Sequence, residues 1–378
     1  MGNGLYLTLL AGPVVAVPVP KPLTDALTAA EVHISDTGTS GFQLSFTLAN
    51  RSPLQTLFLL SAGAPIPMLR VILVATTGAL PQVLMDGVVT HHQISPTAGN
   101  GSSTLTITGE DLSTVMNQVS LSGFPFPGMS PDVRVLTILA KYAAFGVIPA
   151  VVPVFAPDVP IPIDKIPTQK GTDLAYVRQL AKEAGYVFYI EPGPLPGIST
   201  AYWGPQIKVG VPQPALNVNL DSWTNVESLS FQYEPQTAVT PIVFLQDPDS
   251  KAPIPISIPA ANPLNPPLGA IIPTPTNTET LNYTAKLTPA QALMIGLARA
   301  TETGDVVTGE GKLDVLRYGR ILNARQLVGV RGAGLGFDGL HYVQKTSHQL
   351  KRGEYKQSFT LKRNGILSNL PLVPSLPF

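Results

Sequence analysis

Apolar and polar residues alternate along several short stretches in the first third of the chain. Between residues 42 and 48 every second side chain is apolar, and the intervening ones are polar. This period of two is typical of a strand with one face in a core and the other in solvent. Asp86-Gly87 is a hairpin-type turn signal, and the alternation resumes at Leu105 and Ile107. Residues 1–125 are therefore predicted to be antiparallel β structure, in a barrel or a sandwich.

The pattern becomes helical after residue 125. Ser130-Pro131-Asp132 supplies an N-cap, a proline at the first helical position and a carboxylate at the positive end of a helix. A second helix is predicted between Thr172, as its cap, and Gly185, as its end, with a strand directly after it. The proline-rich stretch 147–167 is predicted to be extended and irregular. Residues 126–205 are predicted to form a small inserted α/β domain.

Strand patterns return in the last part of the chain. The predicted elements are strands over 226–233 and 242–246, a helix opened by Thr288-Pro289, and a hairpin over 342–363 that turns at Arg352-Gly353. Residues 251–277 are rich in proline and asparagine, which predicts a long loop over a surface. A second β domain is thus expected over 206–366, followed by a short tail, 367–378. The fold class is mainly β with an α/β insertion.

The composition narrows the classes of function. Lys plus Arg is 24 and Asp plus Glu is 24, so the net charge is zero and the cation surplus that nucleic-acid binding needs is missing. Hydrophobic residues make up 44% and charged residues 13%, which indicates a surface largely covered by protein partners. The chain has no cysteine, which excludes disulfides, thiolate metal sites and cysteine nucleophiles.

Membrane insertion and export are not expected. The apolar stretches 57–80 and 136–163 are both interrupted by prolines and charged residues, so neither is suited to span a bilayer as a helix. The N-terminus has no basic segment ahead of its apolar run, unlike a signal peptide. Synthesis and folding in the cytoplasm are therefore predicted.

The strongest enzyme-like motif is Asp36-Thr37-Gly38-Thr39-Ser40, which matches the signature of aspartic proteases. That chemistry needs two carboxylates that share one proton. No second Asp-Thr/Ser-Gly is present, because Asp221-Ser222 continues into Trp223 and Asp338-Gly339 lacks the hydroxyl residue. A polar turn is the favoured interpretation of the motif. An aspartic-protease-like hydrolase that uses Asp36-Thr37-Gly38 is the alternative function.

The histidines and glycine runs predict no metal or cofactor site. His91 and His92 are adjacent on a predicted strand, so their side chains should point to opposite faces. His341 and His348 are an odd number of residues apart, which separates them in the same way in a regular strand. The run from Gly332 to Gly336 lacks the spacing of a dinucleotide-binding loop. No catalytic, metal-binding or cofactor-binding residue is therefore predicted, and no cofactor.

Three separated segments together resemble the baseplate hub family of contractile phage tails, which includes late-control D proteins and the N-terminal part of VgrG spikes. Residues 85–94 and 105–113 are similar to the family's strand–hairpin–strand, which ends in a Gly-x-Asp-x-Ser turn. Residues 170–191 resemble the helix–Gly–strand of its inserted domain, and residues 339–364 resemble the hairpin that closes its second barrel. Together with residues 225–231, the segments follow the family's order along most of the chain.

The resemblance implies two tail-tube-like antiparallel β-barrels, one near 1–125 and one near 225–366, and a homotrimeric ring that joins a six-fold inner tube to a three-fold spike. The implied partners are the inner tube protein, a spike protein and other baseplate components. A spike barrel, a β-helix and a lysozyme segment are missing after the second barrel, so the spike is expected to be a separate protein. The implied location is a phage-tail-like particle assembled in the bacterial cytoplasm, a class that includes particles released from the cell.

A structural assembly protein is thus the leading hypothesis. Two other classes stay open beside it. A β-rich hydrolase is supported only by the motif at Asp36. A carbohydrate-binding adhesin would be expected to show exposed aromatic clusters, which the sequence does not indicate.

Overall fold

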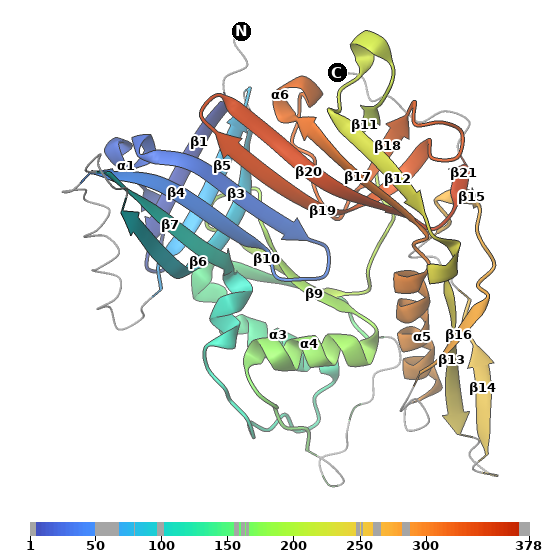
Figure 1. Ribbon diagram of the computed structural model, residues 1–378. Helices are drawn as coiled ribbons and strands as arrows, with labels where there is room; N and C mark the ends of the chain where they lie inside the picture. Colours follow the sequence, from blue (N-terminus) through green and yellow to red (C-terminus); the bar gives the residue numbers. More distant parts are fainter. Residues whose placement is uncertain are drawn as a thin grey trace.

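The computed structural model describes residues 5–49, 68–78, 80–96, 102–154, 159, 163, 166–246, 250, 252–259, 266–281 and 288–369. Strands predominate, and most of them lie in one large sheet across the upper half of the molecule in Figure 1. The longer helices lie below this sheet, in an α/β unit and beside a smaller sheet. The predicted fold class, mainly β with an α/β insertion, is confirmed.

The large sheet contains strands from both halves of the chain. Its members are β1 (Leu5–Gly12), β2 (Val17–Pro18), β3 (Leu27–Ser35), β4 (Gly41–Ala49), β5 (Arg70–Thr77), β6 (Leu80–Pro96), β7 (Ser102–Asp111), β11 (Gln213–Asn217), β12 (Ser228–Tyr233), β17 (Val307–Asp314), β18 (Leu327–Arg331), β19 (Gly339–Lys351) and β20 (Glu354–Arg363). Eleven of them follow the order β12-β17-β20-β19-β3-β4-β7-β6-β5-β1-β2, while β18 pairs with β19 and with β11.

The two halves of the sheet join through β3 and β19. These strands pair antiparallel, with Lys345 opposite Ser35 and Lys351 opposite Ala29. Among the described residues, the two ends of the strand order do not pair with each other. The strands therefore form an open, curled sheet and not the two closed barrels that the resemblance implies.

One apolar core serves both halves of this sheet. The alternating apolar residues of β4, from Phe42 to Leu48, are all buried, as their period of two predicts. Their cluster also contains Leu73 of β5 and, from the second half of the chain, Val328 and Phe359. Burial of apolar surface from distant segments in a single cluster is the main force that holds such segments together.

Asp86-Gly87 lies inside β6 and does not form the predicted turn. Gly87 pairs with Val71 of β5, and a Cβ atom at this glycine would lie 2.2 Å from the backbone oxygen of Glu110. Glycine is therefore required here by the close approach of a neighbouring strand. The carboxylate of Asp86 is buried in an ion pair with Arg70. Both residues of the dipeptide serve packing inside the sheet.

The α/β unit contains two helices against a three-stranded sheet. Its elements are η1 (Leu112–Asn117), α3 (Pro131–Ala140), η2 (Ala143–Phe145), β8 (Val147–Val151), α4 (Asp173–Ala184), β9 (Val187–Pro192) and β10 (Ser199–Gly204). As predicted, Thr172 caps α4, since its hydroxyl accepts a hydrogen bond from the Ala175 N–H, and Gly185 ends it at φ 69°. The stretch 147–167 was predicted to be irregular. Its first residues instead form the strand β8, because β10 pairs with them in parallel.

A smaller sheet and a long helix form a third part, on the right of Figure 1. Its elements are β13 (Val239–Gln246), β14 (Pro253–Ser257), β16 (Asn277–Thr280) and α5 (Pro289–Thr303). β15 (Gly269–Ile271) pairs with β21 (Ile366–Ser368). The predicted loop 251–277 thus contains the two strands β14 and β15, and the first residues of the predicted tail 367–378 belong to β21. Proline is tolerated in β14 because this strand pairs on one side only, with β13.

Short helical turns complete the described part of the chain. They are α1 (Lys21–Asp25), η3 (Asp221–Trp223), η4 (Pro235–Thr237) and α6 (Val315–Tyr318). Among the described residues, no helix is both long and apolar enough to cross a membrane.

Candidate functional site at the junction of the sheet and the α/β unit

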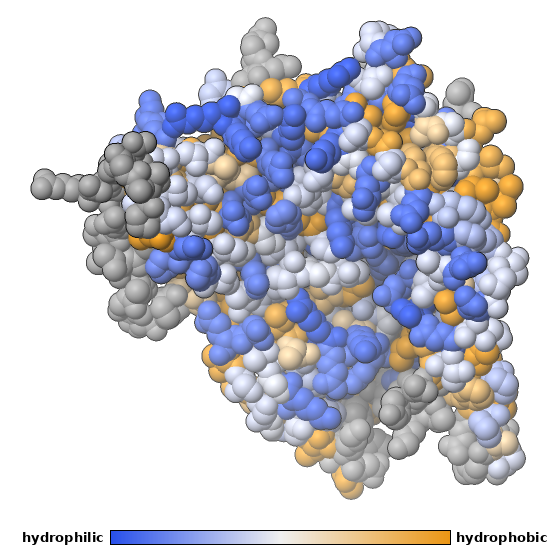
Figure 2. All heavy atoms as spheres, in the orientation of Figure 1, coloured by the Kyte–Doolittle hydropathy of each residue, from blue (hydrophilic) through white to orange (hydrophobic). Residues whose placement is uncertain are grey.

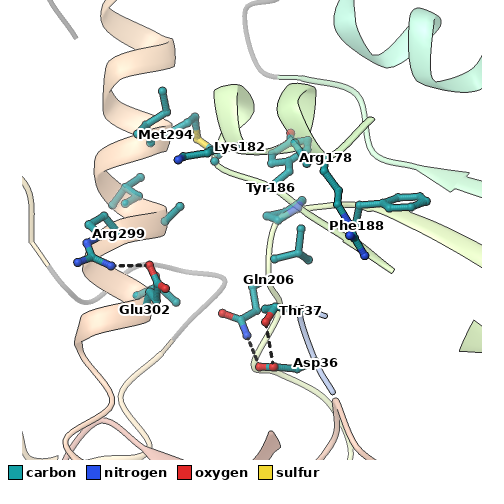
Figure 3. Close-up of a pocket in the computed structure, with 18 of the residues that line it drawn as sticks. Asp36, Thr37, Arg178, Lys182, Tyr186, Phe188, Gln206, Met294, Arg299 and Glu302 are labelled. Carbon is teal, nitrogen blue, oxygen red and sulfur yellow. Dashed lines mark hydrogen bonds and ion pairs between the residues drawn. The ribbon is translucent and has the colours of Figure 1, made fainter. Parts of the chain in front are cut away.

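A cleft with a cavity volume of about 1000 Å³ lies where the large sheet, the α/β unit and α5 meet. Figure 3 shows Arg178 and Lys182 on α4 at one side of the cleft, and Arg299 and Glu302 on α5 at the other. The Asp36 loop, which connects β3 to β4, forms another wall of the cleft. The motif singled out in the sequence therefore lines the cleft that the structure shows.

Asp36 is buried at the edge of this cleft, with 3% of its surface exposed. Its carboxylate accepts a hydrogen bond from the Gln206 amide at 2.8 Å and a longer one from the Thr37 hydroxyl at 3.4 Å. Burial raises the pKa of Asp36, and the nearby cations Lys208 and Arg325 oppose that rise. The arrangement holds one carboxylate in place as a hydrogen-bond acceptor.

A further carboxylate of the cleft, that of Asp305, forms an ion pair with Lys208. The ammonium group of Lys208 lies 2.6 Å from it, and the Lys208 side chain is almost completely buried. The same ammonium group lies 5.5 Å from the centre of the Tyr342 ring. Asp36 is thus hydrogen-bonded to an amide and a hydroxyl, and among the described residues it shares no proton with a second carboxylate. An acid–base dyad needs that sharing.

Arg325 ties the large sheet to the α/β unit. Its guanidinium carbon lies 3.9 Å from the centre of the Tyr189 ring of β9, and it donates a hydrogen bond to the Ser35 carbonyl. Its backbone adopts φ 65°, a left-handed conformation that is uncommon outside glycine. The loop before β18 is therefore held in a specific shape that aims this cation at β9.

A second clamp lies on the other side of the α/β unit. Arg70 of β5 binds both carboxylate oxygens of Asp86 at 2.7 Å, and the Ser199 hydroxyl of β10 donates to the same carboxylate. The guanidinium also donates to the backbone oxygens of Val14 and Gly197. A buried bidentate pair with these extra bonds fixes the orientation of β10 against the sheet.

The Asp36 loop is anchored at its far end as well. The Ser40 N–H donates to the Asp111 carboxylate at 2.6 Å, and the Ser113 N–H donates to the other oxygen at 2.9 Å. Asp111 belongs to the Gly-x-Asp-x-Ser segment on which the family resemblance partly rests. Burial raises the pKa of Asp111, and these hydrogen bonds oppose the rise. Its role here is to cap η1 and to hold the loop.

The histidines do not gather into a metal site. His91 and His92 are exposed on β6, whereas His341 and His348 are both buried on β19. A register shift between Val343 and Lys345 interrupts β19, so the odd spacing does not place the last two on opposite sides. Among the described residues, no group of three potential metal ligands occurs.

The glycine run before β19 is a turn. Gly332 and Gly334 have φ angles of 81° and 98°, a backbone region that favours glycine. The Asp338 carboxylate accepts a hydrogen bond from the Ala333 N–H and so closes the turn. The run leads into a strand and not into a helix, as the missing dinucleotide spacing predicted.

The sequence analysis did not single out Arg70, Lys208 or Arg325. Each is a single cation next to apolar residues in the sequence, and this pattern could have predicted a buried charge. Their carboxylate partners, however, lie between 16 and 134 residues away along the chain, as Arg70 with Asp86 and Arg325 with Glu191 illustrate. Spacing alone does not identify such partners.

No family model matches the chain, and no curated protein matches it. Several solved structures match it. A tail protein from Neisseria meningitidis MC58 matches over 96% of this chain and 98% of its own, with a TM-score of 0.61 and 14% identity. The 43 kDa tail protein of prophage MuSo2 from Shewanella oneidensis matches over 96% and 99%, with a TM-score of 0.61 and 13% identity. This chain has the fold of phage tail proteins.

The tail-protein fold also extends to type VI secretion. A component of that system from E. coli, described as similar in structure to the T4 tail proteins gp27 and gp5, matches over 93% of this chain and 76% of its own, at 12% identity and a TM-score of 0.53. A chain of the Francisella PdpA–VgrG complex matches over 99% and 55%, at 10% identity and a TM-score of 0.58. The resemblance found in the sequence is confirmed at the level of the fold.

Proposed function

We propose that this chain is the structural hub of a contractile tail or injection-system baseplate. In this role three copies form a ring that adapts a six-fold inner tube to a three-fold spike. The observation that carries the proposal is the match of nearly the whole chain to nearly the whole length of two solved tail proteins. Because the match covers nearly the full length of both chains, it reflects the arrangement of all the secondary-structure elements and not one common motif.

The strand order supports the ring. Strands β3, β4, β7 and β6 are consecutive in the large sheet, and so are β19, β20, β17 and β12. The two groups of four are joined edge to edge through β3 and β19. Three copies would present six such groups to a six-fold tube while keeping three-fold symmetry toward a spike, because interfaces in a closed ring repeat identically.

The solvent face of the central strands suits the wall of a channel. Its side chains are mostly uncharged and polar, and they include Gln43, Ser45, Thr47, Thr106, Thr108, Lys356, Ser358, Thr360 and Lys362. Figure 2 shows hydrophilic residues over the part of this face that β19, β20 and β3 form. A wall with little net charge would let cargo pass without holding it, since strong binding of nucleic acid needs clustered cations.

The junction is assigned a mechanical role. The Arg70 and Arg325 clamps fasten the α/β unit to the sheet through buried, directional contacts. Asp36 lies near Arg325 and accepts a hydrogen bond from Gln206, and the chain is not proposed to be an enzyme. The matched solved structures are tail and secretion components, which favours this interpretation over the hydrolase.

Domains and partners follow from the same proposal. Residues 1–125 and 206–366 supply the two tube-like parts, residues 126–205 the inserted α/β domain, and residues 367–378 a tail. The partners are a tube protein, a separate spike protein and baseplate proteins. Assembly takes place in the bacterial cytoplasm, and the product is a phage-tail-like particle.

Co-expression of this chain with candidate tube and spike proteins from the same genome tests the proposal. Native mass spectrometry of the purified complex should show three copies of this chain for each spike trimer. A complex with six copies, or a chain that binds neither partner, would contradict it.

A further inference from the structure

A lysine and an aspartate face each other inside the protein, next to the cleft. The Lys208 ammonium nitrogen lies 2.6 Å from the Asp305 carboxylate oxygen Oδ2, and only 1% and 11% of the two side chains are exposed. Lys208 lies in the loop between β10 and β11, and Asp305 lies in the turn between α5 and β17. The pair therefore joins two segments that are 97 residues apart in the chain.

The surroundings of this pair restrict the access of water. The Lys208 ammonium lies 5.5 Å from the centre of the Tyr342 ring, and Tyr342 is itself buried. Asp305 lines the cleft, so a small molecule released at its carboxyl group has a way out. Two charges that are held away from water in this manner carry a high desolvation cost, which a reaction between them would remove.

The amine and the carboxyl group of the pair are the two reactants of an amide bond. An amine attacks only in its neutral form, and here its proton can pass directly to the carboxylate oxygen that it contacts. Contact in a fixed geometry replaces a bimolecular encounter by a unimolecular step, with effective concentrations of about 10⁵–10⁸ M in well-oriented systems. The fold therefore removes much of the entropic barrier to a bond between these side chains.

A third carboxyl group, that of Asp36, lies within electrostatic reach of both partners. Burial raises the pKa of Asp36, Lys208 opposes this rise, and Asp305 adds to it. The Asp36 carboxylate accepts a hydrogen bond from Gln206, as Figure 3 shows, and Gln206 also forms a hydrogen bond with Tyr342. A carboxyl group with a raised pKa is suited to donate a proton and to take one back.

We infer that Lys208 and Asp305 form an isopeptide bond, from the lysine Nζ to the aspartate Cγ. The nitrogen attacks Cγ, and the bond between Cγ and one carboxylate oxygen breaks. That oxygen leaves as water with two of the three ammonium hydrogens, while the third stays on the amide nitrogen. The step consumes no oxidant, reductant or further reactant. Asp36 is assigned the role of carrying a proton from the nitrogen to the leaving oxygen.

The bond would change how the parts of the molecule are held together. It replaces two buried charges by a neutral amide, and it closes a covalent loop that contains the smaller sheet and α5. A cross-link between distant residues restricts the unfolded chain, as a disulfide does, and the chain has no cysteine with which to form one. The inference is independent of the proposed hub, because it rests on the geometry of a single chain.

Mass spectrometry of the purified, denatured chain tests the bond. The wild type should be lighter than its sequence mass by one water molecule. Trypsin should not cleave after Lys208, and the fragment 183–251 should be joined to the fragment 300–312. A wild type that has its full sequence mass and is cleaved after Lys208 would overturn the inference.

The variant Lys208→Arg is the matched control. Arginine keeps the positive charge that pairs with Asp305, but it is not the amine that the reaction needs. This variant should have its full sequence mass and should unfold at a temperature several degrees lower than the wild type. A loss of water that persists in it would also overturn the inference, because Asp86-Gly87 and Asp338-Gly339 lose the same mass when they cyclise to a succinimide.

A second ion pair in the same chain tests the role given to burial. The Lys141 ammonium lies 2.5 Å from the Asp173 carboxylate, but 42% of the Lys141 side chain is exposed. Water stabilises this ammonium group, so the pair should stay ionic and trypsin should cleave after Lys141. A chain that is linked at Lys141 as well would show that contact alone, without burial, is sufficient.

The variant Asp36→Asn tests the proton carrier. Asparagine keeps an oxygen that accepts from Gln206 but has no carboxyl proton to transfer. The linked fraction at equal times after the start of expression should therefore fall severalfold below that of the wild type. An equal linked fraction would remove Asp36 from the reaction and leave the bond between Lys208 and Asp305 in place.

Discussion

Buried cations in this protein are satisfied in different ways. Arg70 binds a carboxylate through two hydrogen bonds, Lys208 combines a carboxylate with an aromatic ring, and Arg325 combines a carbonyl with a ring. Arg363 donates to the backbone oxygens of Asp338 and Leu367, and burial lowers its pKa to about 10. A charge removed from water costs several kcal/mol unless such partners are present. These residues therefore couple local geometry to stability.

The two buried histidines of β19 should make the protein sensitive to acid. Burial lowers the pKa of His341 and of His348 from an ordinary 6.5 to about 3. The unfolded chain then binds more protons, so the stability is present above pH 6.5 and is lost as pH falls toward 3. Each histidine should contribute a slope of about 1.4 kcal/mol per pH unit. Urea unfolding of His348→Gln between pH 7 and 4 should show the slope reduced by about one proton; an unchanged slope would contradict this.

Asp36 should show the opposite dependence on pH. Its pKa is raised above 3.8 in the folded state, mainly by burial, so stability is lost as pH rises through the window above 3.8. The variant Asp36→Asn keeps an oxygen that accepts from Gln206 but has no charge. Its unfolding free energy relative to the wild type should therefore increase from pH 4 to pH 8 in urea titrations. A relative loss of stability over that range would show that the carboxylate is needed in its charged form.

At the scale of elements, local signals predicted helices better than strand partners. The cap at Thr172 and the stop at Gly185 are local, and α4 begins and ends where they indicate. β14 was missed because its prolines also fit a loop, and only pairing with β13 makes it a strand. The contact of β3 with β19 joins residues about 300 positions apart, and no local pattern encodes it. The junction could not be predicted for the same reason.

The helix α4 should depend on its apolar face. Val177, Leu180 and Ala184 are buried on that face, as the helical spacing predicted. Leu180→Asp would place an unpaired carboxylate in this contact and should cost about 3 kcal/mol or more. The control Ala175→Asp adds the same group at an exposed position near the helix N-terminus and should change stability by about 0.5 kcal/mol or less. Equal melting temperatures for the two variants would show that α4 does not pack as described.

The two partners of the Arg70–Asp86 clamp should respond to mutation in different ways, depending on whether one charge or both are removed. Arg70→Ala leaves the buried carboxylate of Asp86 without its counter-ion and should cost about 3–5 kcal/mol. The double variant Arg70→Met with Asp86→Leu removes both charges and should recover much of that loss. Chemical unfolding of both variants measures the difference. A double variant no more stable than Arg70→Ala would show that the clamp stabilises by more than mutual neutralisation.

At the scale of the whole molecule, the protein is two four-stranded groups fused through one strand pair, with an α/β unit clamped beneath them. In the proposed ring, two four-stranded groups in each chain would relate a six-fold tube to a three-fold spike. The low content of charged residues, 13%, fits a protein that buries much of its surface against partners.

Electron microscopy of the assembled particle tests this account most directly. The density at the end of the tube should contain three copies of this chain around a three-fold axis. The six four-stranded groups should continue the tube wall. A ring of six copies at that position would contradict the account.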